Sequence, residues 1–396
     1  MDKTLIDHAE LGRRDFFRAG AALSAGLMAI GSSAASAAEA PAAGAAAAAP
    51  LKPLSGKMTY DQVLDRAREM MSPKCMVCSE CNGEVCAGQV PGFGGMGAGK
   101  SFQNNYQSLN RVELNMRVIH GVKKPDTSFD FFGTKLSMPA IAAPTGGTTY
   151  NMGGKLTEEE FVTAICGGCS KAGTLGAVAD GIGDPIDVFE KRLQTLKGLG
   201  FKAIVGLKPR TQEEIIQRMK KAAEAGVVAI TIDLDSAGRA ARATPGQTVE
   251  PKTPAQLKEL VKACPVPLLF KGIMTVDEAR ACMNSGAAGI VVSNHGGRVL
   301  AATPGTAEVL PKIADAVNGK LMVMVDGTVK RGTDVQKYLA LGAQGVLVGR
   351  HFIRAAHGGG VDGVALFANR MRDELVVSMT LTGAANVKAI KRNMVA

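Results

Sequence analysis

Short apolar runs alternate with amphipathic stretches along the chain from Pro139 to its end. A short apolar run bounded by turn residues is typical of a strand that is buried on both faces. Each run is followed by a segment with helical spacing, so we expect the strands to lie parallel to one another. The runs are Ala140–Pro144, Leu175–Ala179, Ala203–Leu207, Val228–Leu234, Pro267–Phe270, Gly289–Val292, Leu321–Val325 and Gly345–Val348.

Several of the amphipathic stretches carry helix signals at their ends. Thr157 precedes three glutamates, Glu158–Glu160, which suits an N-cap and the positive end of a helix dipole. Helical patterns over Thr211–Ala225, Thr275–Ser285 and Gly332–Leu341 each end at or near a glycine. Eight strand–helix units predict an α/β fold, a closed (β/α)8 TIM barrel, and an open doubly wound sheet is the structural alternative.

Composition and charge narrow the class of protein. The chain has 396 residues, of which 46% are hydrophobic and 21% charged, an ordinary balance for one large globular domain or two small ones. The net charge of +10 favours anionic ligands. No run of lysine and arginine dominates and only 4% of the residues are aromatic, so we expect no nucleic-acid partner.

The N-terminal residues are predicted to be a targeting segment. Gly12-Arg13-Arg14-Asp15-Phe16-Phe17-Arg18 is followed by an apolar stretch over 19–30 and by Ala35-Ser36-Ala37, which suits a signal peptidase. This order resembles a twin-arginine signal, although the first residue departs from that pattern, and it predicts export of the folded protein to the periplasm. An uncleaved anchor or a chance pair of arginines is the alternative. The chain then divides into a signal peptide, 1–37, a flexible leader, 38–56, an N-terminal extension, 57–138, and a barrel with C-terminal helices, 139–396.

Four cysteines form a cluster in the N-terminal extension, with the spacing C-x2-C-x2-C-x4-C: Cys75, Cys78, Cys81 and Cys86. Four thiols this close together resemble the ligands of an iron–sulfur cluster, and they also suit tetrahedral zinc. Disulfides or free thiols are the alternatives, since an oxidising compartment favours disulfides. The other four cysteines are expected to pack in the core: Cys166, Cys169, Cys264 and Cys282.

Polar residues follow the later strands at the point where each strand ends. Because parallel strands present their carboxyl ends on one side of a barrel, we expect these residues to share one site. His295, followed by two glycines and Arg298, is the most informative ending, because glycine lets the backbone approach a ligand closely. The endings are Thr231-Ile232-Asp233, Phe270-Lys271-Gly272, Ser293-Asn294-His295-Gly296-Gly297-Arg298, Asp326-Gly327-Thr328 and Gly349-Arg350.

Two of these motifs carry a family resemblance. The segment Ser293–Arg298, with Lys271 upstream and Val325–Val335 downstream, resembles the FMN-dependent 2-hydroxy-acid oxidases and dehydrogenases, which include glycolate oxidase, lactate oxidase and the FMN-dependent lactate and mandelate dehydrogenases. The similarity runs from Asn104 to the C-terminus. It implies a TIM-barrel enzyme that binds FMN, oxidises a small 2-hydroxy acid, and passes the electrons to O2, a quinone or a cytochrome. It also implies a homo-oligomer, a tetramer in this family.

The resemblance implies a role for each matching residue. His295 is expected to be the base, Asp233 to stabilise its imidazolium, and Arg298 to clamp the substrate carboxylate. Lys271 is expected beside the flavin ring, where negative charge develops on reduction, and Arg239 is expected to reach the substrate. The positions expected to bind the ring, the ribityl chain and the phosphate of FMN are Ala143, Pro144, Thr145, Thr231, Ser293, Asp326, Gly327, Lys330, Gly349 and Arg350.

The predicted substrate pocket departs from the family pattern. On the third strand the family has a glutamine for the flavin and a tyrosine for the substrate, where this chain has Ala203-Ile204-Val205-Gly206. The family's N-terminal substrate tyrosine has no counterpart, because the cysteine cluster and Pro91–Gly99 occupy that stretch. Lys330 stands where most members carry arginine. We therefore predict a preference for a 2-hydroxy acid with a larger or apolar side chain over glycolate, with Ile204 or Val205 offering the apolar surface.

Two other functions are alternatives for this sequence. One is different flavin chemistry on a related barrel, as in type 2 isopentenyl diphosphate isomerase or the FMN domain of glutamate synthase. Neither of those needs a base next to a carboxylate clamp, which His295 and Arg298 provide here. The other is a non-catalytic electron carrier that binds flavin or a metal cluster, which the cysteines favour but which leaves His295 without a role.

Overall fold

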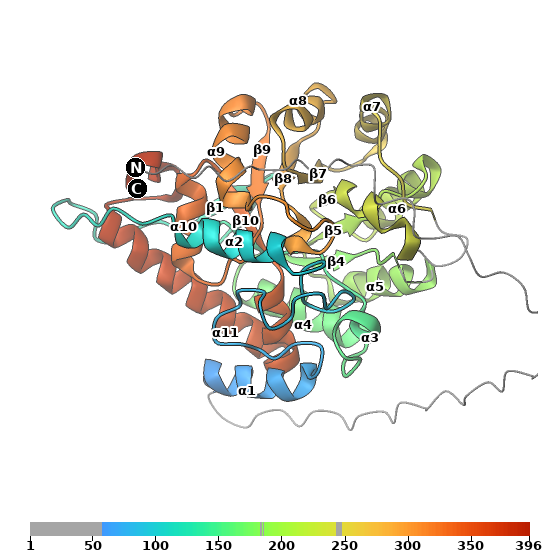
Figure 1. Ribbon diagram of the computed structural model, residues 1–396, viewed down its shortest axis with the longest axis horizontal. Helices are drawn as coiled ribbons and strands as arrows, with labels where there is room; N and C mark the ends of the chain where they lie inside the picture. Colours follow the sequence, from blue (N-terminus) through green and yellow to red (C-terminus); the bar gives the residue numbers. More distant parts are fainter. Residues whose placement is uncertain (1–57, 183, 185, 243–247) are drawn as a thin grey trace, which may run out of the picture. The chain divides into compact units, whose positions relative to one another are not determined.

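Eight parallel strands form the central sheet of the protein, each within or overlapping the apolar run that predicted it (Figure 1). The computed structural model describes residues 58–182, 184, 186–242 and 248–396; the predicted signal peptide and leader lie outside the described residues. Every residue of six of these strands is buried, as expected for strands covered on both faces. The strands are β3 (Ala140–Ala142), β4 (Gly176–Ala179), β5 (Ala203–Leu207), β6 (Ala229–Asp233), β7 (Leu268–Ile273), β8 (Gly289–Val292), β9 (Met322–Val325) and β10 (Gly345–Val348).

The strands close into a barrel. Their order in the sheet is β3-β10-β9-β8-β7-β6-β5-β4, and all the neighbours pair in parallel. The two ends of this sheet meet where the Ala142 amide donates a hydrogen bond of 3.1 Å to the Leu175 carbonyl, just before β4. The predicted (β/α)8 barrel is therefore confirmed, and the open doubly wound alternative is wrong.

Each barrel strand is followed by a helix that packs on the outside of the sheet. Threonines cap four of these helices: Thr157, Thr211, Thr253 and Thr275 each accept a hydrogen bond from a backbone amide of the first turn. The barrel helices are α4 (Glu158–Lys171), α5 (Ile186–Leu199), α6 (Gln212–Glu224), α7 (Pro254–Ala263), α8 (Val276–Asn284), α9 (Thr306–Val317), α10 (Gly332–Ala340) and α11 (Arg350–Thr382).

Short elements sit between the strands and helices at the carboxyl end of the barrel and in the tail. Two of them carry predicted site residues: the 3-10 segment η1 (Leu234–Arg242) follows β6, and η2 (His295–Gly297) follows β8. The helix α3 (Thr148–Asn151) lies between β3 and α4. Near the C-terminus are η3 (Val387–Ala389) and η4 (Arg392–Met394).

The N-terminal extension packs onto the barrel through two helices. The helix α1 (Tyr60–Met71) lies against α11, where the rings of Tyr60 and Phe367 stack with centroids 5.8 Å apart. The helix α2 (Lys100–Asn110) lies beside η2, and Asn105 Nδ2 donates to Asn294 Oδ1 at 2.7 Å. A small antiparallel hairpin, β1 (Phe129–Phe131) and β2 (Thr134–Leu136), precedes β3.

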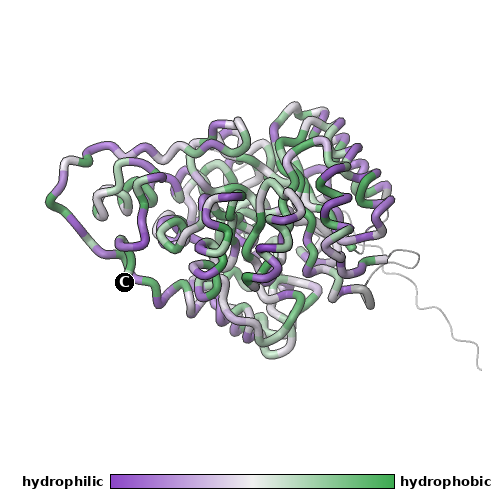
Figure 2. Tube along the Cα trace, turned by 90° about the horizontal axis from the view of Figure 1, so that it is seen from above, coloured by the Kyte–Doolittle hydropathy of each residue, from purple (hydrophilic) through white to green (hydrophobic). Residues whose placement is uncertain are grey.

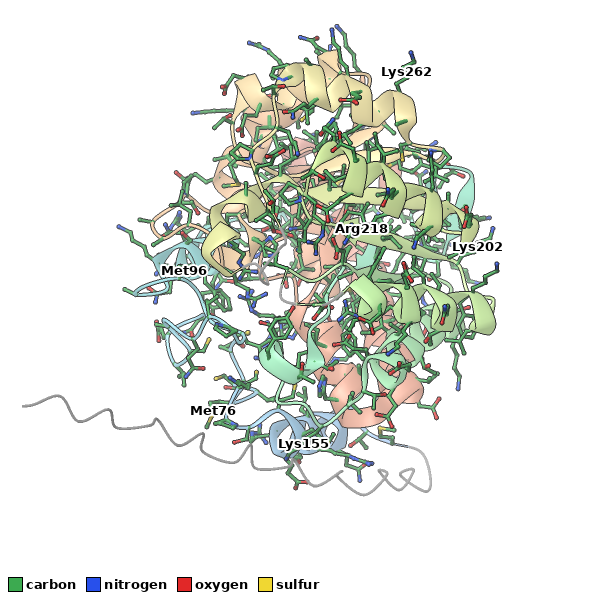
Figure 3. All side chains as sticks on the ribbon, turned by 90° about the vertical axis from the view of Figure 1, so that its right-hand side faces the viewer. Met76, Met96, Lys155, Lys202, Arg218 and Lys262 are labelled. Carbon is green, nitrogen blue, oxygen red and sulfur yellow. The ribbon has the colours of Figure 1, made fainter. Side chains whose placement is uncertain are left out.

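Hydrophobic residues concentrate in the middle of the barrel and between the sheet and its helices (Figure 2). Charged side chains such as Lys202 and Lys262 point outward from the helical layer (Figure 3). In the described part of the chain, we find no helix that is both long enough and apolar enough to cross a membrane.

Candidate active site

A cavity of about 520 Å³ opens at the carboxyl ends of the barrel strands. This volume lies within the range of small-molecule sites, and its position is that of the active site in TIM-barrel enzymes. Most of the residues that the sequence places in one site are brought together here. The predicted residues that line the cavity are Ala143, Pro144, Thr145, Arg239, Lys271, His295, Arg298, Asp326, Gly327, Gly349 and Arg350.

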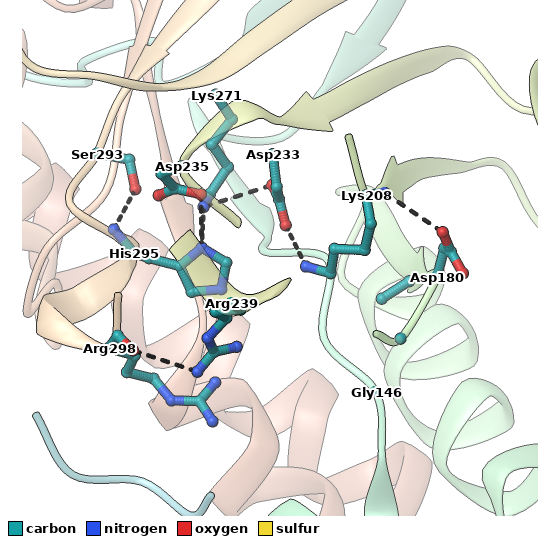
Figure 4. A network of polar contacts seen from close by, with 12 residues as sticks. Gly146, Asp180, Lys208, Asp233, Asp235, Arg239, Lys271, Ser293, His295 and Arg298 are labelled. Carbon is teal, nitrogen blue, oxygen red and sulfur yellow. Dashed lines mark hydrogen bonds and ion pairs between the residues drawn. The ribbon is translucent and has the colours of Figure 1, made fainter. Parts of the chain in front are cut away.

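His295 stands in η2, directly after β8, with a left-handed backbone (φ 58°). Its backbone amide donates to Ser293 Oγ at 2.9 Å, and its ring nitrogen Nδ1 lies 2.9 Å from Asp235 Oδ1 (Figure 4). Because a carboxylate oxygen accepts, Nδ1 carries the proton in this contact. The other ring nitrogen, Nε2, is then the one that can accept a proton.

The carboxylate on His295 is Asp235 and not the predicted Asp233. Asp233 Oδ2 instead forms an ion pair with Lys208 Nζ at 2.6 Å, and Asp233 Oδ1 lies 3.5 Å from Lys271 Nζ (Figure 4). The reason is local: β6 ends at Asp233, whose side chain is 2% exposed inside the barrel, and the chain then turns into η1. That turn brings Asp235 alongside the imidazole.

Burial and neighbouring cations set the charges of this network. Burial, with Lys271 and Lys208 nearby, holds the pKa of His295 well below its usual 6.5, so the imidazole is neutral at neutral pH. Burial opposes ionisation of Asp233, but Lys208 and Lys271 outweigh it and lower the pKa of this carboxyl to about 2. Burial raises the pKa of Asp235, so the site holds a neutral base in contact with Asp235 and the ionised carboxylate of Asp233 nearby.

Lys271 lies on β7 in the middle of this group. Its Nζ is within 3.5 Å of Asp233 Oδ1 and of His295 Nδ1, and 3.8 Å from Asp326 Oδ2. Burial alone would lower the pKa of Lys271, but the carboxylates of Asp233, Asp235 and Asp326 outweigh burial and raise it. The ammonium is thus a fixed positive charge on the cavity wall.

Two arginines face the same part of the cavity. Arg298 follows η2, and its Nη2 donates to Asn151 Oδ1 of α3 at 2.8 Å. Arg239 lies in η1, and its Nη2 donates to the backbone carbonyl of Arg298 at 3.3 Å (Figure 4). Two guanidinium groups beside a neutral base form a site that suits a carboxylate ligand.

Several buried polar atoms near the cavity match a flavin ligand. Thr231 Oγ1, Asp326 Oδ1 and Thr328 Oγ1 are buried and have no hydrogen-bond partner among the described residues. Buried polar atoms are rarely left unpaired, so these three point to a polar ligand. Ser293 Oγ, in contrast, already donates to Asp326 Oδ2 at 2.8 Å. The predicted ring and ribityl positions therefore fit FMN, with Ser293 acting through Asp326.

The first turn of α11 forms the phosphate end of the predicted flavin site. Gly349 precedes this helix, and the free amides of a first helical turn favour an anion. Arg350 stacks on the Phe102 ring, with its guanidinium carbon 3.7 Å from the ring centroid, and donates to the Phe93 and Gly296 carbonyls, each at 2.9 Å. The guanidinium is thereby fixed at the edge of the cavity.

Lys330 lies elsewhere than the resemblance implies. Its Nζ donates to the Ser79 carbonyl at 2.5 Å and to Glu80 Oε1 at 3.1 Å, beside a separate cavity of about 30 Å³. Glu80 also accepts from Arg331 at 3.3 Å. Residues 72–99, which we call the cysteine segment, thus supply a carboxylate partner for Lys330. Lys330 does not line the larger cavity, whereas Gly349 and Arg350 do.

The predicted metal site in the cysteine cluster is not supported. Among the described residues no group of three or more histidines, cysteines or carboxylates is arranged to hold a metal ion. Each cysteine of the cluster is a free thiol: Cys75, Cys78, Cys81 and Cys86. The sulfur atoms of Cys75 and Cys81 instead share one guanidinium nitrogen, Arg354 Nη2, at 3.6 and 3.1 Å.

The sequence analysis did not predict several residues of the site. Among them, Tyr150 from α3 and Lys208 after β5 line the cavity, and Asp235 contacts His295. Ile204 and Val205, expected to offer apolar surface, do not line it; they are buried in the barrel core. Lys208 and Asp235 lie one and two residues beyond their strands, a position that could have marked them as site candidates.

Comparisons with known proteins agree with this geometry. The family model for FMN-dependent dehydrogenases matches residues 93–255 and 241–396. Glycolate oxidase 3 of Arabidopsis thaliana is 30% identical over 329 residues, 74% of this chain and 86% of that protein. Glycolate oxidase of Spinacia oleracea is 29% identical, over 74% of this chain and 86% of that protein. A crystal structure of mandelate oxidase with (S)-2-phenylpropionate superposes with a TM-score of 0.70 at 26% identity, covering 86% of this chain and 98% of that one. The chain belongs to the FMN-dependent dehydrogenase family.

Proposed function

We propose that this protein oxidises a 2-hydroxy acid to the corresponding 2-oxo acid with FMN as its cofactor. The observation that carries the proposal is a neutral, carboxylate-held His295 next to Arg298 and Arg239 on one wall of the cavity. A base beside two carboxylate-binding groups fits a substrate whose hydroxyl-bearing carbon adjoins a carboxylate. The named relatives, glycolate and mandelate oxidases, support the same chemistry.

FMN would be held by Asp326, Thr328 and Thr231 along the ring and ribityl chain, and by Arg350 with the first turn of α11 at the phosphate. When bound, FMN supplies the acceptor for the two electrons that the substrate loses. Lys271 presents a fixed positive charge to the cavity, where it stabilises negative charge that develops during the reaction.

The protein's own groups then handle the substrate and its proton. Arg298 and Arg239 bind the carboxylate, and Asn151 holds the Arg298 guanidinium in place through its 2.8 Å hydrogen bond. His295 accepts a proton from the substrate at Nε2, because Nδ1 is engaged by Asp235. The imidazolium that forms is stabilised by Asp235 in direct contact and by Asp233, whose charge is nearby.

The substrate's side chain is proposed to be larger than that of glycolate. This chain lacks the family's substrate tyrosine on the third strand. Tyr150 of α3 is a tyrosine that does line the cavity. Apolar side chains also contribute to the wall: Phe93, Met152 and Ile182. An aromatic or branched side chain would bury against this surface, which favours it over the small glycolate by the hydrophobic effect.

The context of the reaction is also a proposal. The protein is exported to the periplasm in folded form by its twin-arginine segment, and it assembles with copies of itself, as the sequence resemblance implies. The electrons taken from the substrate would pass on to O2, a quinone or a cytochrome. The fully folded, cofactor-loaded protein is the form that such a signal exports.

Product analysis tests the proposed function. Purified holoenzyme is incubated with an artificial electron acceptor and a panel of acids, including glycolate, lactate and mandelate, and the 2-oxo acids are quantified. We expect 2-oxo acid from at least one member, with mandelate preferred to glycolate. Arg298→Lys should raise the Michaelis constant by about 10-fold or more, since an ammonium cannot replace a bidentate guanidinium worth roughly 1.5–3 kcal/mol. Absence of 2-oxo acid from every member, with FMN bound, would refute the proposal.

A further inference from the structure

The cysteine segment lies against the cavity although the proposed reaction does not use it. This segment runs between α1 and α2 and carries Met76 and Met96, which lie along one side of the barrel (Figure 3). Two of its thiols are nearly inaccessible from outside: Cys75 is 4% exposed and Cys81 is 9% exposed. Cys81 nevertheless belongs to the lining of the main cavity.

Both buried thiols contact the same arginine. Arg354, on the second turn of α11 and 3% exposed, donates from Nη2 to Cys81 Sγ at 3.1 Å and to Cys75 Sγ at 3.6 Å. Its Nη1 donates to the Cys78 carbonyl at 3.4 Å, and its Nε has no hydrogen-bond partner among the described residues. Cys75 also accepts from the Val77 amide at 3.4 Å.

The side-chain acceptors of this arginine are sulfur atoms. Across the described ranges, the ion pairs of the protein do not include Arg354, and its Nη2 contacts Cys81 Sγ and Cys75 Sγ. Burial would lower the pKa of Arg354, but the neighbouring cysteines outweigh burial and raise it. The guanidinium is therefore held against both sulfurs, where it stabilises negative charge that develops on sulfur during a reaction.

We propose that Cys81 and Cys75 form a peroxide-reactive thiol pair, with Cys81 as the attacking residue and Cys75 as the resolving one. Cys81 is assigned as the attacking residue because it lines the cavity and lies nearer than Cys75 to Arg354 Nη2. The ligand class is hydrogen peroxide or a small hydroperoxide. Both sulfurs contact the same guanidinium nitrogen, and the second step requires them to approach each other.

The chemistry balances in two steps. In the first, Cys81 Sγ attacks one peroxide oxygen: an S–O bond forms, the O–O bond breaks, and the departing oxygen takes the thiol proton and leaves as water, or as an alcohol from a hydroperoxide. In the second, Cys75 Sγ attacks the sulfenic acid on Cys81: an S–S bond forms, the S–O bond breaks, and the hydroxyl leaves as water with the Cys75 proton. Two sulfurs are oxidised and one peroxide is reduced.

Peptide mapping of the intact holoenzyme tests the pair. The full-length protein is reduced, desalted, exposed to a small excess of hydrogen peroxide, and quenched by alkylation at successive times. Cys264 is the internal control, because it is a partly exposed thiol with only a backbone hydrogen bond beside it. We expect the Cys81 thiol to disappear at least about tenfold faster than the Cys264 thiol. The product should be a Cys75–Cys81 disulfide.

Two variants sharpen the test. In Cys75→Ser, Cys81 should persist as a sulfenic acid that dimedone traps, because the resolving thiol is gone. Arg354→Lys should slow loss of the Cys81 thiol by about tenfold and leave Cys264 unchanged, since an ammonium cannot serve both sulfurs. Three results would each overturn the proposal, even where Arg354→Lys fails to fold. The first is an equal rate of thiol loss for Cys81 and Cys264 in the unmodified chain. The others are a disulfide from Cys81 to Cys78 or Cys86 in place of Cys75, and no trapped sulfenic acid in Cys75→Ser.

Discussion

At the scale of single residues, the protonation state of His295 depends on groups from three strands. Lys271 of β7 and Lys208 after β5 disfavour the imidazolium, while Asp235 after β6 holds Nδ1. The resulting imidazole is neutral and directed by one hydrogen bond. This arrangement assigns different tasks to the two aspartates: Asp235 orients the base, and Asp233 neutralises the two lysines.

Replacing each of the two aspartates by asparagine should therefore have a different effect. Asp235→Asn removes a charge-assisted hydrogen bond, worth about 1.5–3 kcal/mol, and should lower kcat roughly 10- to 100-fold with the fold intact. Asp233→Asn leaves Lys208 and Lys271 without their shared counter-charge, so it should mainly lower thermal stability. Steady-state kinetics and thermal unfolding of both variants measure the two effects separately. Full activity in Asp235→Asn would show that the contact with His295 has no catalytic role.

The pH dependence of the reaction should reflect the buried histidine. Because the pKa of His295 lies well below 6.5, its basic form persists as pH falls through that value, and kcat/KM should stay level there and decline only at lower pH. Lys208→Gln removes a nearby positive charge, which stabilises the imidazolium, raises its pKa and moves the decline to higher pH by about one pH unit. A wild-type midpoint at 6.5, or a shift to lower pH in the variant, argues against this explanation.

At the scale of elements, the barrel was predictable because each strand is covered on both faces. The sequence of such a strand is a continuous apolar run, and the predicted run Ala203–Leu207 matches β5 at both ends. The helix starts were predictable where a cap was present, as at Thr157 before α4. The role of Asp235 was not predictable, because it depends on how η1 turns after β6. Hydrophobic periodicity does not specify the path of an irregular turn.

The cap of α4 offers an element-scale prediction. Thr157 accepts from the Glu160 amide at 3.1 Å, and the Glu160 carboxylate accepts from the Thr157 amide at 2.8 Å. Thr157→Ala removes the side-chain half of this capping box and should lower the free energy of unfolding by about 1 kcal/mol. Thr157→Ser is the matched control, since it keeps the hydroxyl. Equal stability of the two variants in urea titrations would mean that the cap adds nothing.

At the scale of the whole molecule, polar contacts join the N-terminal extension to the barrel. Glu80 of the cysteine segment engages Lys330, and Asn105 of α2 engages Asn294 beside the base. Each of these pairs joins residues far apart in sequence, and such contacts follow from tertiary packing, so the sequence could not predict them. Most of the residues that the family motifs predicted, including Lys271 and Arg298, line the cavity, because strand ends meet at one end of any closed barrel.

In the proposed reaction, His295 takes a proton from a 2-hydroxy acid, and FMN would supply the acceptor for its electrons. Anaerobic mixing of the holoenzyme with its best acid, followed by flavin absorbance, measures this step alone. We predict complete bleaching of the wild-type flavin, and bleaching about 100- to 10,000-fold slower in His295→Ala with FMN still bound. Bleaching of His295→Ala within about threefold of wild type, far below the usual contribution of a general base, would contradict the account, as would a wild-type flavin that no 2-hydroxy acid reduces.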